Sequence, residues 1–128
     1  MRTDAREFAF KIIFEKLFKD GDDSLSFNAI SEEKALNEQD LAFYNELIKA
    51  FEENSKDVEE TVKECCEGYE LDRVYKVDLA LLYLAVSEIK FVKTPHAVVI
   101  NEVLNLAKKY STDKSGSFIN GVLAKVVK

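Results

Sequence analysis

The 128-residue sequence predicts an all-α fold. Hydrophobic residues make up 47% of the chain and include nine phenylalanines, enough to build a sizeable core. The chain has only four glycines and one proline, whereas a sandwich or barrel of many short strands needs frequent turn residues. Several segments also repeat their apolar residues at the 3.6-residue period of a helix. We therefore expect residues 1–128 to form a single globular helical domain.

A first helix is predicted at the N-terminus. Asp4 and Glu7 have the spacing of a capping box, in which Asp4 accepts at the N-cap and Glu7 reaches back to it. The apolar residues that follow cover most of the helix circumference, so this helix should lie at the centre of the fold. They are Ala5, Phe8, Ala9, Phe10, Ile12, Ile13, Phe14, Leu17 and Phe18. Gly21 is expected to end the helix, and a short second helix should follow through Ile30.

Two further helices are expected between residues 37 and 66. The first begins at Asn37 and faces the core with one stripe of side chains. This stripe consists of Leu41, Tyr44, Leu47, Ile48 and Phe51. The sequence "ENSKD" should break it before a strongly charged fourth helix, whose apolar side carries Val58, Val62 and Cys66. Because Cys65 and Cys66 are adjacent, they suit neither an ordinary disulfide nor a metal site, and we expect them to be structural bystanders.

The second half of the chain predicts three more helices. After a connector, "VDLALLYLAVSEIKFV" is so uniformly apolar that it should be a second central helix, packed on several sides. Thr94 and Pro95 have N-cap and N1 chemistry and should open a helix that runs to Tyr110. Ser115 is expected to cap the last helix.

The last helix contains Asn120-Gly121, a strong turn signal. However, the apolar stripe that includes Phe118 and Val122 continues across it at helical spacing, so we expect the helix to be unbroken. A glycine inside a helix costs about 1 kcal/mol relative to alanine. We therefore expect a close approach by another helix or a ligand to compensate at Gly121.

The sequence gives little support for catalysis, a cofactor or a metal. His96 is the only histidine, and Ile100 occupies the i+4 position where a second ligand would stand. Carboxylates are abundant, but none can be paired for acid–base chemistry from the sequence. The longest apolar run, Leu79 to Val86, is far shorter than the ~20 residues of a membrane span. The N-terminal sequence "MRTDAREF" lacks the apolar core of a signal peptide, and we expect a cytoplasmic protein.

The net charge of −6 is unevenly distributed. Residues 1–31 carry five basic and six acidic side chains, and residues 32–70 carry four and thirteen. Residues 71–128 carry nine basic and five acidic side chains. A polyanion could therefore meet the C-terminal half and the N-terminal tip while avoiding the acidic middle.

Three segments resemble the NusB family of transcription antitermination factors. "PHAVVINEVLNLAKKYSTDKSGSFINGVLAKV" is similar to the C-terminal family signature, in which a Pro-x-x-Val-x-Ile-Asn-Glu helix and a Phe-(Ile/Val)-Asn-Gly-Val-Leu helix flank a short loop. "AREFAFKIIF" resembles the opening helix of the family, and "LDRVYKVDLALLYLAVSEI" resembles its middle helix. The likeness covers the whole chain.

The resemblance implies a fold of about seven helices in two small perpendicular bundles, at about residues 1–67 and 71–128. It implies no catalysis. Members of the family bind the boxA element of ribosomal RNA leader transcripts together with NusE, a small-subunit ribosomal protein. The complex then joins RNA polymerase and suppresses termination.

The resemblance also implies functional residues. Carried over by position, the residues expected to bind single-stranded RNA are Arg2, Arg6, Tyr69, Lys108, Tyr110, Lys114 and Phe118. Cations would follow the phosphates and aromatic rings would stack on bases. Phe14 and Asp78 would face the NusE-like partner.

The chain departs from the family by having only three arginines, Arg2, Arg6 and Arg73. We therefore expect weaker RNA binding by the protein alone and greater dependence on its partner. One alternative is a protein-interaction adaptor that has little RNA affinity of its own. An accessory domain like those fused to rRNA cytosine methyltransferases is disfavoured, because no catalytic domain is present.

Simpler roles are open for several of these side chains. Arg2 and Arg6 can be ordinary exposed residues of a first helical turn. Tyr110 and Phe118 can be core residues, since aromatic side chains at helical spacing usually are. Asp78 can serve only to cap the buried helix.

Overall fold

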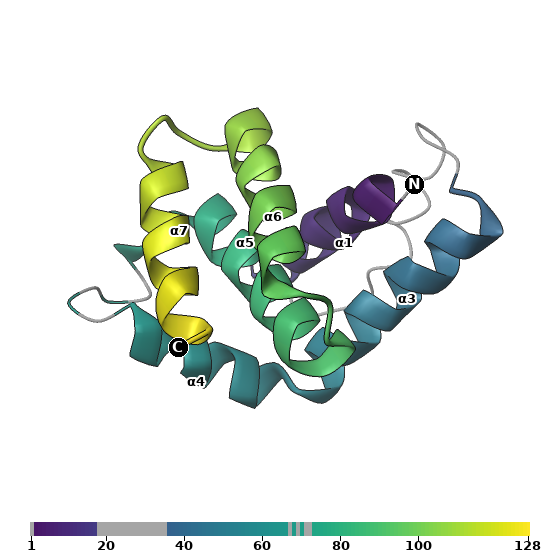
Figure 1. Cartoon of the computed structure of the whole chain (residues 1–128), viewed down its shortest axis with the longest axis horizontal. Helices are drawn as coiled ribbons and strands as arrows, with labels where there is room; N and C mark the ends of the chain where they lie inside the picture. The colour runs from purple at the N-terminus through teal and green to yellow at the C-terminus, as the bar shows by residue number, and fades with distance from the viewer. Residues whose placement is uncertain (1, 18–35, 67, 69, 71–72) are drawn as a thin grey trace.

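The computed structural model describes residues 2–17, 36–66, 68, 70 and 73–128, and this part of the chain contains helices and no strands (Figure 1). The helices are α1 (Arg2–Lys16), α3 (Glu38–Glu53), α4 (Ser55–Cys65), α5 (Lys76–Ser87), α6 (His96–Tyr110) and α7 (Ser115–Val126), with a π-helical turn η2 (Glu88–Val92). The all-α prediction is confirmed. The short helix expected through Ile30 lies outside the described residues. Within those residues, no helix has the length and apolar character needed to cross a bilayer.

Helix α5 lies at the centre of the fold. It packs against α1, α3, α4, α6 and α7, and every side chain from Asp78 to Ser87 is buried. The continuous apolar sequence predicted this position, because a helix that is apolar on all sides is stable only when other elements surround it.

Helix α1 is buried over most of its length against α3 and α5, as its sequence predicts. The predicted capping box is wrong. The helix already includes Arg2, so Asp4 lies within the first turn and is not the N-cap. Glu7 is buried, and its carboxylate binds side chains of α6.

Helix α3 begins as predicted, because the side chain of Asn37 accepts a hydrogen bond of 2.8 Å from the backbone N–H of Asp40. Tyr44, Leu47, Ile48 and Phe51 are buried as expected, whereas Leu41 is exposed. The chain then turns at Asn54 into α4, which contacts α3, α5 and α7. The division into bundles of about 1–67 and 71–128 stays a prediction.

The turn η2 continues directly from α5 and ends at Lys93, whose φ of 65° is left-handed. The backbone N–H of Lys93 donates to the carbonyl of Glu88 at 2.8 Å, which closes the wide turn. This reversal brings α6 back along α5 and leaves the Glu88 side chain fully buried.

Helix α7 runs without a break across Asn120-Gly121, so the helical period prevails there as predicted. Of the two expected forms of compensation at Gly121, the close approach by another helix is not found in the described part of the molecule, and the approach by a ligand stays a prediction. A Cβ added there would meet no atom within 4 Å. Gly121 therefore faces open space, and helix packing does not require a glycine at this position.

Candidate nucleic-acid interface

The loop between α6 and α7 is held to the start of α5 by Asp78. Its carboxylate accepts hydrogen bonds from the hydroxyls of Ser111 at 2.5 Å and Ser115 at 3.0 Å. The hydroxyl of Thr112 lies 2.9 Å from that of Ser115 and extends the network. The loop is therefore fixed from both of its ends, and any ligand meets a preformed surface.

Two expectations are affected by this network. Asp78 is only 5% exposed, so little of its side chain is open to a partner protein, and its carboxylate is bound by the loop hydroxyls. Ser115 is the first residue of α7 rather than its N-cap, which is Lys114, and its hydroxyl points to Asp78. The simpler role considered for Asp78, as a residue that stabilises its own surroundings, agrees with these contacts.

The C-terminal end of α6 is attached to α1 through Glu7. The hydroxyl of Tyr110 and the ammonium of Lys109 both donate to the same oxygen of Glu7, the ammonium at 2.6 Å. This hydrogen bond raises the pKa of Lys109. The Tyr110 ring lies 5.3 Å from that of Phe10, centroid to centroid, and is partly exposed beside the ammonium of Lys11. Tyr110 therefore presents part of a ring whose position is fixed.

Arg6 does not lie on the surface, contrary to its predicted role. Its guanidinium donates to both carboxylate oxygens of Glu88, at 2.8 and 2.6 Å, and to Glu102 at 3.2 Å. Arg6 is 3% exposed and Glu88 is fully buried. The positive charge that the family resemblance assigns to RNA binding is used inside the protein, where it joins α1, η2 and α6.

Arg2 is exposed, as its predicted role requires. Its guanidinium carbon lies 4.3 Å from the centroid of the Phe43 ring, so the side chain stacks on α3. A hollow of about 450 Å³ beside it is lined also by Asp40 and Glu46. These carboxylates reduce the attraction of this site for a phosphate.

The other predicted residues differ in their exposure. Lys108 and Lys114 are exposed near the two ends of the α6–α7 loop. Phe118 is partly buried against the core, and so is Phe14, whose ring lies 6.3 Å from that of Phe10. Tyr69 lies outside the described residues.

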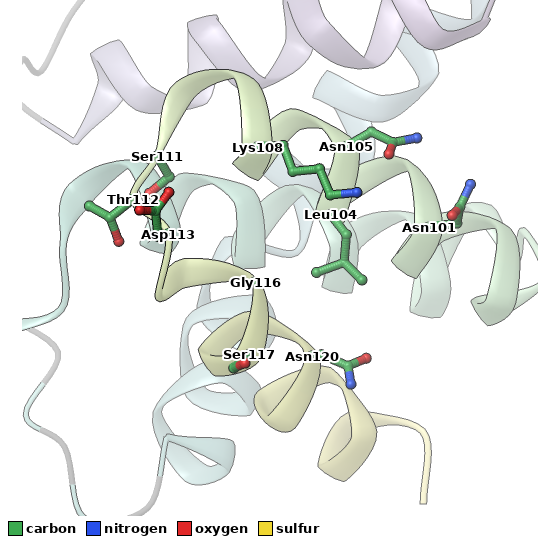
Figure 2. A pocket seen from close by; sticks show the side chains of 10 residues that line it. All are labelled: Asn101, Leu104, Asn105, Lys108, Ser111, Thr112, Asp113, Gly116, Ser117 and Asn120. Carbon is green, nitrogen blue, oxygen red and sulfur yellow. The ribbon is translucent and has the colours of Figure 1, made fainter.

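A groove of about 480 Å³ separates the outer faces of α6 and α7 (Figure 2). It is lined by Asn101, Leu104, Asn105, Lys108, Ser111, Thr112, Asp113, Gly116, Ser117 and Asn120. Of the predicted residues that the structure describes, only Lys108 lines it. The three asparagines were not predicted, although Asn101, Asn105 and Lys108 lie one helical turn apart on a single face of α6.

The described residues offer little for catalysis or metal binding. They contain no group of three or more histidine, cysteine or acidic side chains that could hold a metal ion. Both cysteines are free, and burial raises the pKa of each thiol, which makes a reactive thiolate less available. The polar groove and the exposed lysines are instead suited to binding.

Comparisons with known proteins agree on one family. Residues 3–128 match the model described as the NusB family. The transcription antitermination protein NusB of Acetivibrio thermocellus is 38% identical over 128 residues, which cover 99% of this chain and 88% of the relative.

Solved structures give the same result. The structure of T. maritima NusB has a TM-score of 0.84 and 29% identity, and covers 98% of this chain and 89% of its own. A crystal structure of the antitermination factors NusB and NusE in complex with dsRNA has a TM-score of 0.88 and 25% identity, covering 98% and 94%. The chain belongs to the NusB family.

Proposed function

We propose that this protein is a transcription antitermination factor that binds boxA-type single-stranded RNA together with a NusE-like ribosomal protein. Its relatives in the family are antitermination proteins, and one similar structure holds NusB and NusE with RNA. The complex would act on RNA polymerase, without catalysis by this chain. Transcription takes place in the bacterial cytoplasm, so the proposed function implies a cytoplasmic location.

The observation that carries the RNA proposal is the fixed surface at the α6–α7 loop. Lys108 and Lys114 are exposed on either side of a loop that Asp78 holds in place. These lysines and Arg2 would bind phosphates. The bases would stack on the aromatic rings of Phe118 and Tyr110 and on that of Tyr69, which lies outside the described residues. Arg6 would contribute indirectly, by holding α1 in position. Phe14 is the remaining proposed contact for the partner protein.

The test is fluorescence anisotropy with a labelled boxA-type RNA, with and without the NusE-like protein, over a series of salt concentrations. The affinity should fall as salt rises, because RNA binding releases counterions. Lys108→Gln and Lys114→Gln should each reduce the slope by about 0.7, the value for one phosphate contact on a single strand.

Lys49→Gln is the matched control, because Lys49 is an exposed lysine of α3 and the change removes the same charge. It should leave the slope unchanged. Absence of any salt-dependent binding by the wild-type protein, with or without the partner, would overturn the RNA proposal.

The burial of Arg6 favours a second function. With Arg6 in a buried ion pair, the exposed Arg2 and Arg73 are the arginines left for phosphates, and Arg73 itself lies 3.6 Å from a carboxylate oxygen of Glu70. The protein would then be an adaptor that binds the NusE-like partner and has little RNA affinity of its own. In the same experiment, such an adaptor would show no RNA binding without the partner, and Lys108→Gln and Lys114→Gln would leave the salt slope unchanged when the partner is present, because the partner would supply the phosphate contacts.

A further inference from the structure

We propose that the groove between α6 and α7 binds one unpaired base of the RNA through the carboxamides of Asn101, Asn105 and Asn120. This inference rests on the proposed function and deepens it, since it adds selection of a base to binding of the backbone. At about 480 Å³ the groove is within the size range of small-ligand sites.

The three carboxamides come from both walls of the groove. Figure 2 shows Asn101 and Asn105 on α6 and Asn120 on α7. All three residues are exposed. Each carboxamide carries a donor and an acceptor in one plane, which matches the paired donor and acceptor on the edge of a base. In the described part of the chain, no side-chain hydrogen bond occupies any of the three.

The groove also offers a surface for the face of a base. Leu104 projects from α6 toward α7 and supplies apolar area between the amides (Figure 2). On the α7 side the lining residues are small. A Cβ at Gly116 would meet nothing within 4 Å, so the space beside the backbone is open. A flat ring can therefore lie in the groove against Leu104.

The charges around the groove favour a nucleotide over a cation or an apolar helix. Lys108 lines the groove and can bind the phosphate that precedes or follows the base. Asp113 is the only carboxylate among the described lining residues, which is too few for a cation site. The part of the lining that the structure describes contains a single large apolar residue, Leu104, whereas a groove that takes an amphipathic helix needs a row of them.

The experiment measures binding of a labelled single-stranded boxA-type RNA of about 12 nucleotides, in the presence of the NusE-like protein. Asn105→Leu and Asn120→Leu keep the approximate size of the side chain and remove its hydrogen bonds. Each should weaken binding about tenfold, the loss typical of a bidentate base contact. The salt slope should not change, because it counts phosphate contacts alone.

A series of RNAs, each with one abasic nucleotide, identifies the bound base. The wild-type protein should lose affinity at the positions whose bases stack on aromatic rings and also, by about tenfold, at the position whose base enters the groove. The two asparagine variants should show no further loss at that position, since the contact is already absent. Asn45→Leu is the control, because Asn45 is an exposed asparagine of α3. Circular dichroism confirms that each variant is folded.

Two results would overturn the inference. If the asparagine variants bind like Asn45→Leu while the lysine variants still lower the salt slope, the groove does not bind a base and the proposed function stands. If the wild-type protein shows no salt-dependent binding, both the base site and the RNA proposal fail.

Discussion

The guanidinium of Arg6 is surrounded by acceptors from two later segments of the chain, Glu88 and Glu102. Burying a charge is costly, and the cost is offset only when a partner of opposite charge is well placed. Here both oxygens of Glu88 are used, and the ring of Phe43 lies 5.1 Å from the guanidinium carbon. The pair is therefore a structural element of the core.

Arg6→Ala should destabilise the protein by about 3–5 kcal/mol, because it leaves the carboxylate of Glu88 buried without its cation. Chemical denaturation measures this loss. Arg2→Ala is the control and should cost less than about 1 kcal/mol, since Arg2 is exposed. The double variant Arg6→Met/Glu88→Leu should recover part of the loss. An Arg6→Ala protein as stable as Arg2→Ala would contradict the structural role.

Tyr83 gives the protein a pH dependence in the alkaline range. The residue is 4% exposed, and burial raises the pKa of its hydroxyl from 10.0 to about 12. A raised pKa in the folded state means that the unfolded chain loses the proton first. The stability associated with neutral Tyr83 is therefore present below pH 10 and is lost as the pH rises toward 12.

At about pH 11 this effect should reduce the free energy of unfolding by about 1.4 kcal/mol relative to neutral pH. Tyr83→Phe should remove that part of the decline, because phenylalanine does not titrate. Urea denaturation of both proteins at several pH values measures the difference. Equal declines in the two proteins would show that Tyr83 does not cause the pH dependence.

At the scale of the elements, the sequence predicted helices where the pattern is local. The α3 N-cap depends on Asn37 and a backbone N–H three residues later, and α5 depends on one continuous apolar run. The hydrogen bonds of the Glu7 carboxylate are instead with Lys109 and Tyr110, which are over 100 residues away in the sequence. Its spacing from Asp4 suggested a cap, but the contact that forms is between helices.

The turn η2 and the groove could not be predicted either, because both depend on contacts between residues far apart in the sequence. The sequence from Glu88 to Val92 continues the apolar character of α5, and only the left-handed Lys93 and the ion pair to Arg6 distinguish it. The spacing of Asn101 and Asn105 is visible in the sequence. The position of α7 opposite them depends on how Asp78 holds the intervening loop.

Helix α7 provides a prediction about stability. Gly121→Ala should stabilise the protein by about 0.5–1 kcal/mol, because alanine is the better helix former and its Cβ meets no atom within 4 Å. Thermal unfolding measures the gain. A loss of stability would contradict the conclusion that Gly121 faces open space. Since Gly121 does not line the groove, RNA binding should be unchanged.

For the molecule as a whole, charge is separated along the chain. The acidic residues 32–70 include α3 and α4, whereas the more basic residues 71–128 include α6 and α7. Figure 1 shows α3 and α7 on opposite sides of the molecule. The α6–α7 part of the proposed RNA surface thus lies away from α3, whereas Arg2 stacks on α3. Attraction to RNA is therefore local rather than long-range.

The long sequence separations of the α1 contacts also affect how the protein is made. Arg6 meets Glu88 across 82 positions and Glu7 meets Lys109 across 102. During synthesis, the apolar N-terminal segment leaves the ribosome well before these partners exist. Its apolar face can pack on α3 as soon as that helix has been made, but its ion pairs with η2 and α6 can form only after those later segments have left the ribosome, so the native contacts of α1 should be completed late in synthesis.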